Sequence, residues 1–120
     1  MESLEIADLI GIPYKENGRD LKGLDCYGLV IEVERRLGKH LIDIVYDNHD
    51  EDLADEFKPL LNIREVRQIY RGVILEMHID GELHLGVALN NNFMIHATTN
   101  QGVRISKIGC LPVEHRYEVV

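Results

Sequence analysis

The stretch Gly23–Leu29 constrains the chain most, because it combines a helix start signal with a thiol on the first helical residue. Asp25 is a suitable N-cap, since its carboxylate can accept a hydrogen bond from an unpaired N–H group of the first turn. Apolar residues then recur at helical spacing until Gly38, a residue type that favours a C-terminal stop. We therefore predict an amphipathic helix over Cys26–Leu37.

The position of Cys26 predicts a reactive thiol. At a helix N-terminus, free N–H groups and the helix dipole stabilise a thiolate and lower the pKa of the cysteine. The alternative is a buried thiol that packs as a small hydrophobic side chain, which is what we expect of the less reactive Cys110. Gly28 is costly inside a helix. It indicates either that a group needs the space beside Cys26 or that the helix packs tightly on a strand.

Length and charge exclude several classes of protein. With 120 residues, we expect one domain over residues 1–120. A net charge of −8 argues against nucleic acid or an anionic membrane as partner, since both require clustered Lys and Arg. The sequence has no signal-peptide pattern and no stretch that could span a membrane, so we expect it to be cytoplasmic when synthesised. The two cysteines form no zinc or disulfide pattern, and we expect no metal and no cofactor.

From residue 73 onward the pattern changes to strands. Residues 73–79 and 82–89 flank Asp80-Gly81, which is a favoured two-residue hairpin turn. A third strand is expected over residues 93–98, after a turn of three asparagines. Two short strands over 103–105 and 117–120 would complete an antiparallel sheet of about five strands.

Two histidines are predicted to share one face of this sheet. If Leu89 pairs with Phe93, paired positions sum to 182, and His96 lies opposite Gly86 and diagonal to His84. The small side chains beside His84 on this face, at Gly86 and at residue 88, leave a shallow surface. We expect the start of the Cys26 helix to sit there, which would bring thiol and imidazole together.

The remaining segments carry weaker signals. Residues 3–10 are compatible with a short amphipathic helix, and residues 13–23 with a loop. Residues 43–61 favour a second amphipathic helix with an acidic outer face. Calcium binding is the alternative there, but the segment lacks the glycine and final glutamate of an EF-hand loop. Residues 62–71 are ambiguous between a helical turn and an irregular connector.

Four ordered segments resemble the motifs of the NlpC cysteine peptidases, papain-like enzymes of bacteria and their phages that cleave peptide bonds in cell-wall peptidoglycan. The segments are Gly11–Tyr14, Leu24–Val30, His84–Val87 and Ile95–Ala97. The resemblance extends over residues 9–105. It implies an α+β fold of the papain-like NlpC type, in which the nucleophile helix, one of the N-terminal helices, packs on the antiparallel sheet.

The resemblance also implies roles for individual residues. Cys26 would be the nucleophile, His84 the base, and His96 the residue that orients the imidazole of His84. Three further residues are predicted to contact the substrate: Tyr14, Asp25 and Tyr27.

The chain departs from the family pattern at three places. Many members have serine after the nucleophile, where this chain has Tyr27, and an aromatic residue there looks more like the phage and prophage tail-associated branch. Lys15–Gly18 replaces a common tryptophan-glycine-glycine, and Arg71-Gly72 replaces the glycine-aspartate that usually opens the first sheet strand. These changes concern substrate contacts rather than catalytic residues.

The sequence thus predicts a cysteine peptidase that hydrolyses amide bonds of peptidoglycan stem peptides through a triad of Cys26, His84 and His96. The backbone N–H of Cys26 is the expected oxyanion donor. We expect a phage or prophage setting, with phage tail proteins as partners and the protein either virion-associated or released on lysis. Two alternatives stay open: a structural tail subunit with vestigial activity, and an acyl transferase or amidase that uses the same triad.

Overall fold

The computed structural model of this chain describes residues 5–43 and 61–120. Its elements are, in order, η1 (Ala7–Leu9), β1 (Arg19–Asp20), β2 (Gly23–Leu24), α1 (Cys26–Arg36), β3 (Ile63–Glu65), β4 (Ile74–Ile79), β5 (Glu82–Ala88), β6 (Phe93–Thr98), β7 (Gly102–Lys107), η3 (Ile108–Cys110) and β8 (Val113–Val119). No helix within these residues is long and apolar enough to cross a membrane.

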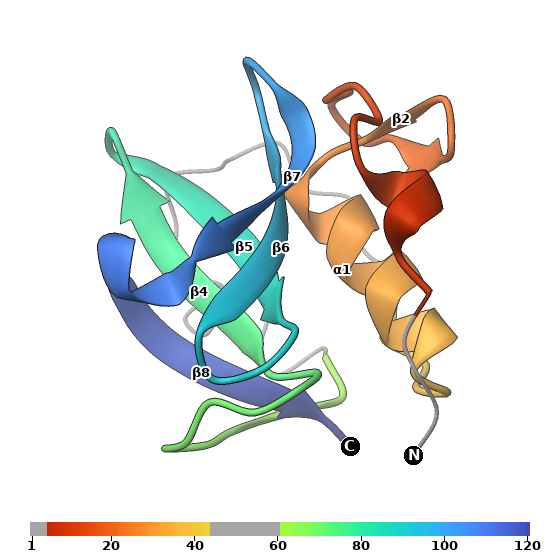
Figure 1. The fold of residues 1–120 in the computed structure, drawn as a ribbon. Coiled ribbons are helices and arrows are strands. Elements are labelled where there is room, and N and C mark those ends of the chain that lie inside the picture. Colours follow the sequence, from red (N-terminus) through yellow and green to blue (C-terminus); the bar gives the residue numbers. More distant parts are fainter. Residues whose placement is uncertain (1–4, 44–60) are drawn as a thin grey trace.

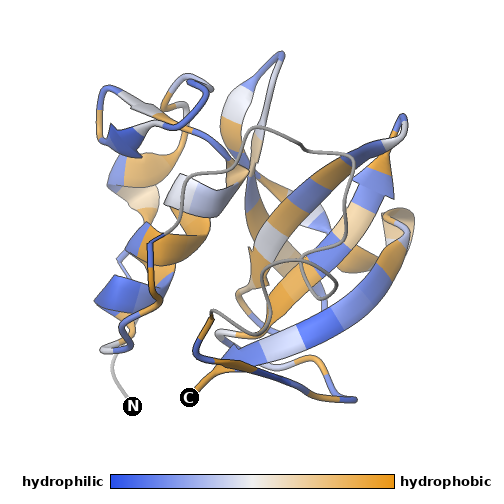
Figure 2. Ribbon diagram, turned by 180° about the vertical axis from the view of Figure 1, so that it is seen from behind, coloured by the Kyte–Doolittle hydropathy of each residue, from blue (hydrophilic) through white to orange (hydrophobic). Residues whose placement is uncertain are grey.

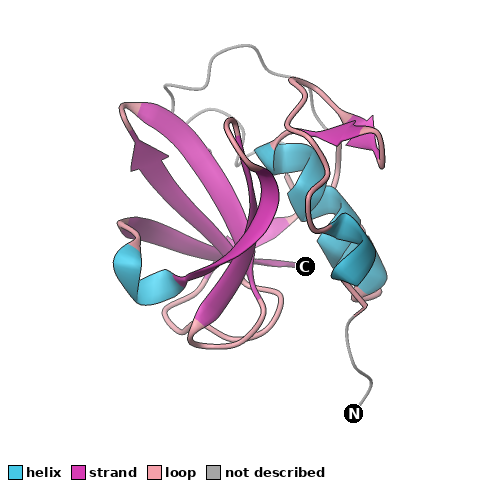
Figure 3. Cartoon of the chain, turned by 45° about the horizontal axis from the view of Figure 1, so that its top comes forward, coloured by secondary structure: helices cyan, strands magenta, loops and turns pink. Residues whose placement is uncertain are grey.

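One sheet and one α-helix make up most of the described fold. Six strands form an antiparallel sheet in the order β3-β8-β4-β5-β6-β7, and β1 and β2 form a separate two-stranded sheet. Helix α1 lies beside the large sheet, and the small sheet lies over the N-terminal end of α1 (Figures 1 and 3). The predicted α+β class, with the Cys26 helix packed on an antiparallel sheet, is therefore confirmed. The strand number is six rather than about five, because β3, in the ambiguous segment, pairs with β8 at the sheet edge.

Helix α1 forms where the sequence predicts it. The side chain of Asp25 caps it by accepting a hydrogen bond from the backbone N–H of Gly28, and Gly38 follows the helix with a φ of +83°. The helix ends at Arg36, with Leu37 as its C-cap. Its apolar side is buried toward the sheet, as the colours of Figure 2 show, and its charged residues face outward.

The helix packs on the opposite face of the sheet from the one predicted. It buries its side chains against the face of Leu85 and its alternate neighbours in β5 rather than against the face of His84 and Gly86. A Cβ built on Gly86 would lie 2.3 Å from the methyl carbon of Met94. The space at Gly86 is thus filled by Met94 from the next strand, within a second apolar cluster behind the sheet that also contains Ala88.

The predicted hairpins have the predicted register. Asp80 and Gly81 both have positive φ, of +54° and +82°, as the favoured two-residue turn requires. Strands β5 and β6 pair with positions that sum to 182, from Ala88↔Met94 to Gly86↔His96.

Beyond the Gly86↔His96 pair, the sheet forks. Pairing of β4 with β5 continues to Ile79↔Glu82, and pairing of β6 with β7 continues to Thr98↔Gly102. The β5–β6 ladder, in contrast, stops after three pairs. The two hairpins therefore separate above Gly86, as Figure 1 shows at the top of the sheet.

Several other elements differ in type or length from the sequence predictions. Within residues 3–10 the described helix is one 3-10 turn, η1, and residues 13–23 include β1 and the start of β2. The strands expected over 103–105 and 117–120 are longer, as β7 and β8. The predicted acidic helix over 43–61 lies almost wholly outside the described residues.

Candidate active site

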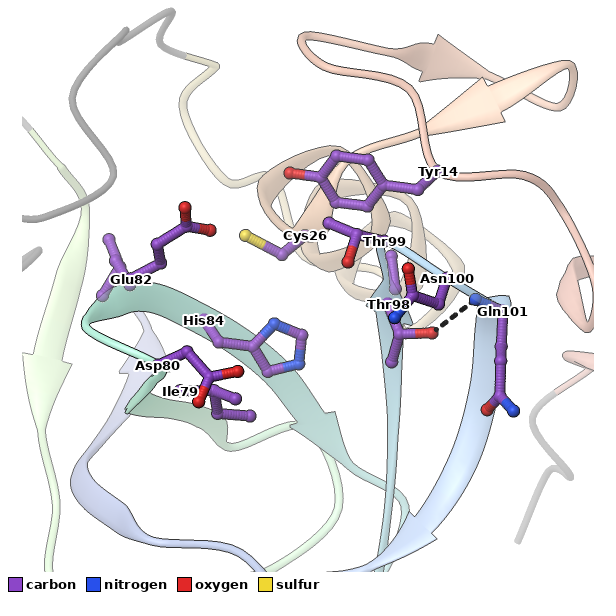
Figure 4. Close-up of a pocket in the computed structure, with 12 residues that line it drawn as sticks. Tyr14, Cys26, Ile79, Asp80, Glu82, His84, Thr98, Thr99, Asn100 and Gln101 are labelled. Carbon is purple, nitrogen blue, oxygen red and sulfur yellow. Dashed lines mark hydrogen bonds between the residues drawn. The ribbon is translucent and has the colours of Figure 1, made fainter.

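A cleft of about 490 Å³ opens where the sheet forks. Its walls come from the β4–β5 hairpin, from the end of β6 with the turn that follows, from Tyr14 and from the N-terminus of α1 (Figure 4). Of the predicted site residues, Cys26, His84 and Tyr14 line this cleft. The sulfur of Cys26 points into the space between the ring of Tyr14 and the imidazole of His84.

Backbone N–H groups and burial act in opposite directions on the pKa of the Cys26 thiol. The N–H groups of Cys26, Tyr27 and Leu85 each lower this pKa, the last of them reaching the thiol from β5. Burial outweighs them: Cys26 is 2% exposed, and desolvation, with a smaller contribution from the charge of Asp25, raises the pKa of the thiol to about 12. The predicted lowering of the Cys26 pKa is therefore wrong for the resting site. The helix terminus favours the thiolate, but the burial of the side chain disfavours it more strongly.

His84 is held by His96 behind the cleft. The Nε2 atom of His84 lies 2.6 Å from Nδ1 of His96, and the two rings meet edge to face with centroids 4.9 Å apart. Burial lowers the pKa of each imidazole to about 4, so both are neutral at pH 7. Because Nε2 of His84 is engaged by His96, Nδ1 is the nitrogen of His84 that is left for the thiol proton.

Tyr14 reaches the cleft from the segment before α1. A bridge between Tyr14 and Leu24 holds this segment beside the strand that leads into the helix. Burial raises the pKa of the Tyr14 phenol, which keeps it protonated as a hydrogen-bond donor. Its hydroxyl group faces the open space above the thiol (Figure 4).

Asp25 lies beneath the site rather than in its lining. It is 3% exposed, and its carboxylate accepts hydrogen bonds from the backbone N–H of Gly28 at 2.7 Å, from Nη1 of Arg19 at 2.8 Å and from the backbone N–H of Asn17 at 2.9 Å. These three donors join the helix start to the loop before it. Arg19 extends the network, since its Nε donates to Asp43 at 2.9 Å.

Tyr27 is also buried away from the cleft, at 1% exposure. Its hydroxyl donates a hydrogen bond of 2.5 Å to the carbonyl of Ile42, and its ring lies 5.7 Å from the guanidinium of Arg19. Gly28, one turn into the helix, leaves room for the same loop: a Cβ there would lie 2.2 Å from the carbonyl oxygen of Gly18. The loop backbone at Gly18 thus occupies the space beside Gly28, rather than a strand of the large sheet.

One contact in the site involves a residue that the sequence analysis missed. The Oγ atom of Ser106 lies 2.7 Å from Nε2 of His96. Ser106 is on β7, where it pairs with Met94, so it shares the sheet face of His96. The alternation of residues 102–107 could have indicated a strand with Ser106 on one face, but only the pairing of β6 with β7 shows which face. Within the described residues, no group of three or more His, Cys, Asp or Glu side chains could hold a metal ion.

Comparison with known proteins identifies the family. The model of the NlpC/P60 family matches residues 11–118. The chain belongs to the NlpC/P60 family. A search of curated proteins finds no match.

Two solved structures share the NlpC/P60 fold of this chain. The NlpC/p60 domain of the peptidoglycan hydrolase SagA superposes with a TM-score of 0.61 at 23% identity, over 96% of this chain and 94% of that one. NlpC2 from Trichomonas vaginalis superposes with a TM-score of 0.66 at 20% identity, over 95% of this chain and 44% of that one. At these identities the likeness concerns the fold.

Proposed function

We propose that this NlpC/P60 protein is a cysteine peptidase that hydrolyses amide bonds of peptidoglycan stem peptides, with Cys26 as nucleophile, His84 as base and His96 as the residue that orients the base. The proposal rests chiefly on one observation: Cys26 and His84 line the same cleft, and His96 engages the far nitrogen of His84. Membership of the family and the similarity to a peptidoglycan hydrolase support the substrate class.

In the proposed reaction, Nδ1 of His84 accepts the thiol proton as the sulfur attacks the amide carbonyl. The resting pair is neutral, so proton transfer accompanies the attack. The backbone N–H of Cys26 stabilises the oxyanion of the tetrahedral intermediate. His84 then gives its proton to the leaving amine, and a water molecule deprotonated by His84 hydrolyses the thioester.

The predicted substrate residues take different parts in this proposal. Tyr14 donates a hydrogen bond to the substrate from the wall above the thiol. Asp25 and Tyr27 act through the position of the helix start, because their polar atoms are engaged by the chain itself. The phage or prophage setting, with release on lysis or carriage on a virion, rests on the aromatic residue at position 27.

A digest of purified peptidoglycan tests the activity. Wild-type protein should release fragments whose stem peptides are cut with the gain of one water, as mass spectrometry would show. Cys26→Ala should release none, whereas Cys110→Ala, which alters an exposed thiol outside the cleft, should match the wild type. Intact peptidoglycan after incubation with folded wild-type protein would instead favour the structural tail subunit. Products that carry an added amine in place of water would favour the acyl transferase.

A further inference from the structure

The hydrogen-bonded chain behind the nucleophile does not end at His96. Nε2 of His84 meets Nδ1 of His96 at 2.6 Å, and Nε2 of His96 meets Oγ of Ser106 at 2.7 Å. His96 is 4% exposed, so an N–H on its Nε2 depends on a protein acceptor. Ser106 is half-buried on the neighbouring strand and supplies that acceptor.

The order of protons along this chain decides whether His84 can act as a base. A neutral imidazole has one N–H and one acceptor nitrogen. In one order, His84 donates from Nε2 to His96, and His96 donates from Nε2 to Ser106, which leaves Nδ1 of His84 free to take the thiol proton. In the reverse order, Ser106 donates to His96 and His96 donates to His84. The proton of His84 then occupies Nδ1, and the base is blocked.

We propose that Ser106 is a positioning residue, which accepts the Nε2–H of His96 and so supplies the buried acceptor that the proton order with a free Nδ1 on His84 requires. When His84 gains the thiol proton, both of its nitrogens carry hydrogen. Only the first order can accommodate that state, since His96 must then accept at Nδ1 and donate at Nε2. With Ser106 in place, no proton behind His84 has to move during the reaction. The kinetic consequence of this inference rests on the proposed function.

Two substitutions separate the hydroxyl group from the packing at this position. Ser106→Ala removes the acceptor, and we expect kcat to fall by about tenfold, the loss of one buried hydrogen bond, with KM unchanged. Ser106→Thr keeps a hydroxyl and should stay within about twofold of the wild-type kcat. Lys107→Ala, a change in the next residue of β7, serves as the control and should leave kcat unchanged.

Nitrogen NMR of the histidine rings gives a readout that does not depend on activity. The wild type and Ser106→Thr should carry the His96 proton on Nε2, and Ser106→Ala should show it partly on Nδ1. Wild-type protein with the His96 proton on Nδ1, or Ser106→Ala with wild-type tautomers and wild-type kcat, would overturn the inference. If the tautomers follow Ser106 as described but the wild-type protein leaves peptidoglycan intact, the positioning role stands and the proposed function fails.

Discussion

Asp25 and Glu34 are buried carboxylates at opposite ends of α1, and their surroundings differ. Asp25 accepts three hydrogen bonds at the end that carries Cys26. Glu34 lies in the last turn, is 0% exposed, and neither of its oxygens has a hydrogen-bond partner within the described residues. Both ends of the helix have polar contacts, since Arg36 pairs with Asp8 at the C-terminal end. The difference lies in the buried carboxylates: Asp25 is hydrogen-bonded, whereas Glu34 has no hydrogen bond among the described residues. Substitutions at the two ends should therefore affect stability in opposite directions.

The largest effect is expected at Asp25. Asp25→Ala removes the N-cap and leaves the buried N–H group of Gly28, the N–H group of Asn17 and part of the Arg19 guanidinium without their acceptor. We expect the free energy of unfolding to fall by about 3 kcal/mol in urea denaturation. Asp20→Ala is the matched control, since that exposed carboxylate accepts a turn hydrogen bond from the backbone N–H of Lys22. An equal loss in both variants would show that the network around Asp25 adds nothing beyond an ordinary turn contact.

The second largest loss of stability is expected at Gly28, where the loop that contains Gly18 packs on the start of α1. Gly28→Ala should stabilise an isolated helix, but the added Cβ would lie 2.2 Å from a backbone oxygen of Gly18. We expect a net loss of about 2 kcal/mol in unfolding free energy, because the loop backbone must shift. Gly109→Ala, where a Cβ meets nothing within 4 Å, should be close to neutral. A stabilising Gly28→Ala would contradict this packing.

At the other end of α1, Glu34→Gln should increase stability above neutral pH. Burial raises the pKa of Glu34 to about 7, against the weaker opposing charge of Lys39. Between about pH 4.5 and pH 7, the unfolded chain releases this proton and the folded chain keeps it. Stability due to Glu34 is therefore fully present below about pH 4.5 and is lost as the pH rises from there through 7.

For Glu34→Gln we expect a gain of about 1.5 kcal/mol at pH 8 and none at pH 4, from unfolding curves at both values. The gain is limited because the glutamine amide is also buried without a partner. A gain of the same size at both pH values would show that ionisation of Glu34 is not the cause.

The two ends of α1 also show what a sequence can predict. The cap at Asp25, the stop at Gly38 and the β5–β6 register follow from residues close together in the chain, and all three are confirmed. The loop that presses on Gly28 and the contact of Ser106 with His96 depend on tertiary packing. Local patterns carry no information about such contacts.

The sheet face on which α1 packs also depends on tertiary packing. Small residues beside His84 suggested room for the helix, but Met94 from the next strand fills that room. Cys26 and His84 instead line the cleft at the fork, where the β5–β6 ladder ends. Alternation along one strand can predict that two faces exist, but it cannot predict where two hairpins separate.

The last prediction concerns the alkylation rate of Cys26 rather than stability. It reverses the expectation from sequence that Cys26 is the more reactive of the two thiols. Cys26 is buried with a pKa raised to about 12, whereas Cys110 is exposed. Because the thiolate is the form that reacts, iodoacetamide at pH 7 should label Cys110 much more than about tenfold faster than Cys26, as peptide mapping would measure. The rate for Cys26 in Cys110→Ala protein should keep rising with pH above 9. A rate for Cys26 that exceeds that for Cys110 and levels off near pH 6 would instead reveal a preformed thiolate–imidazolium pair with His84. The helix terminus would then outweigh burial, as the sequence alone suggested.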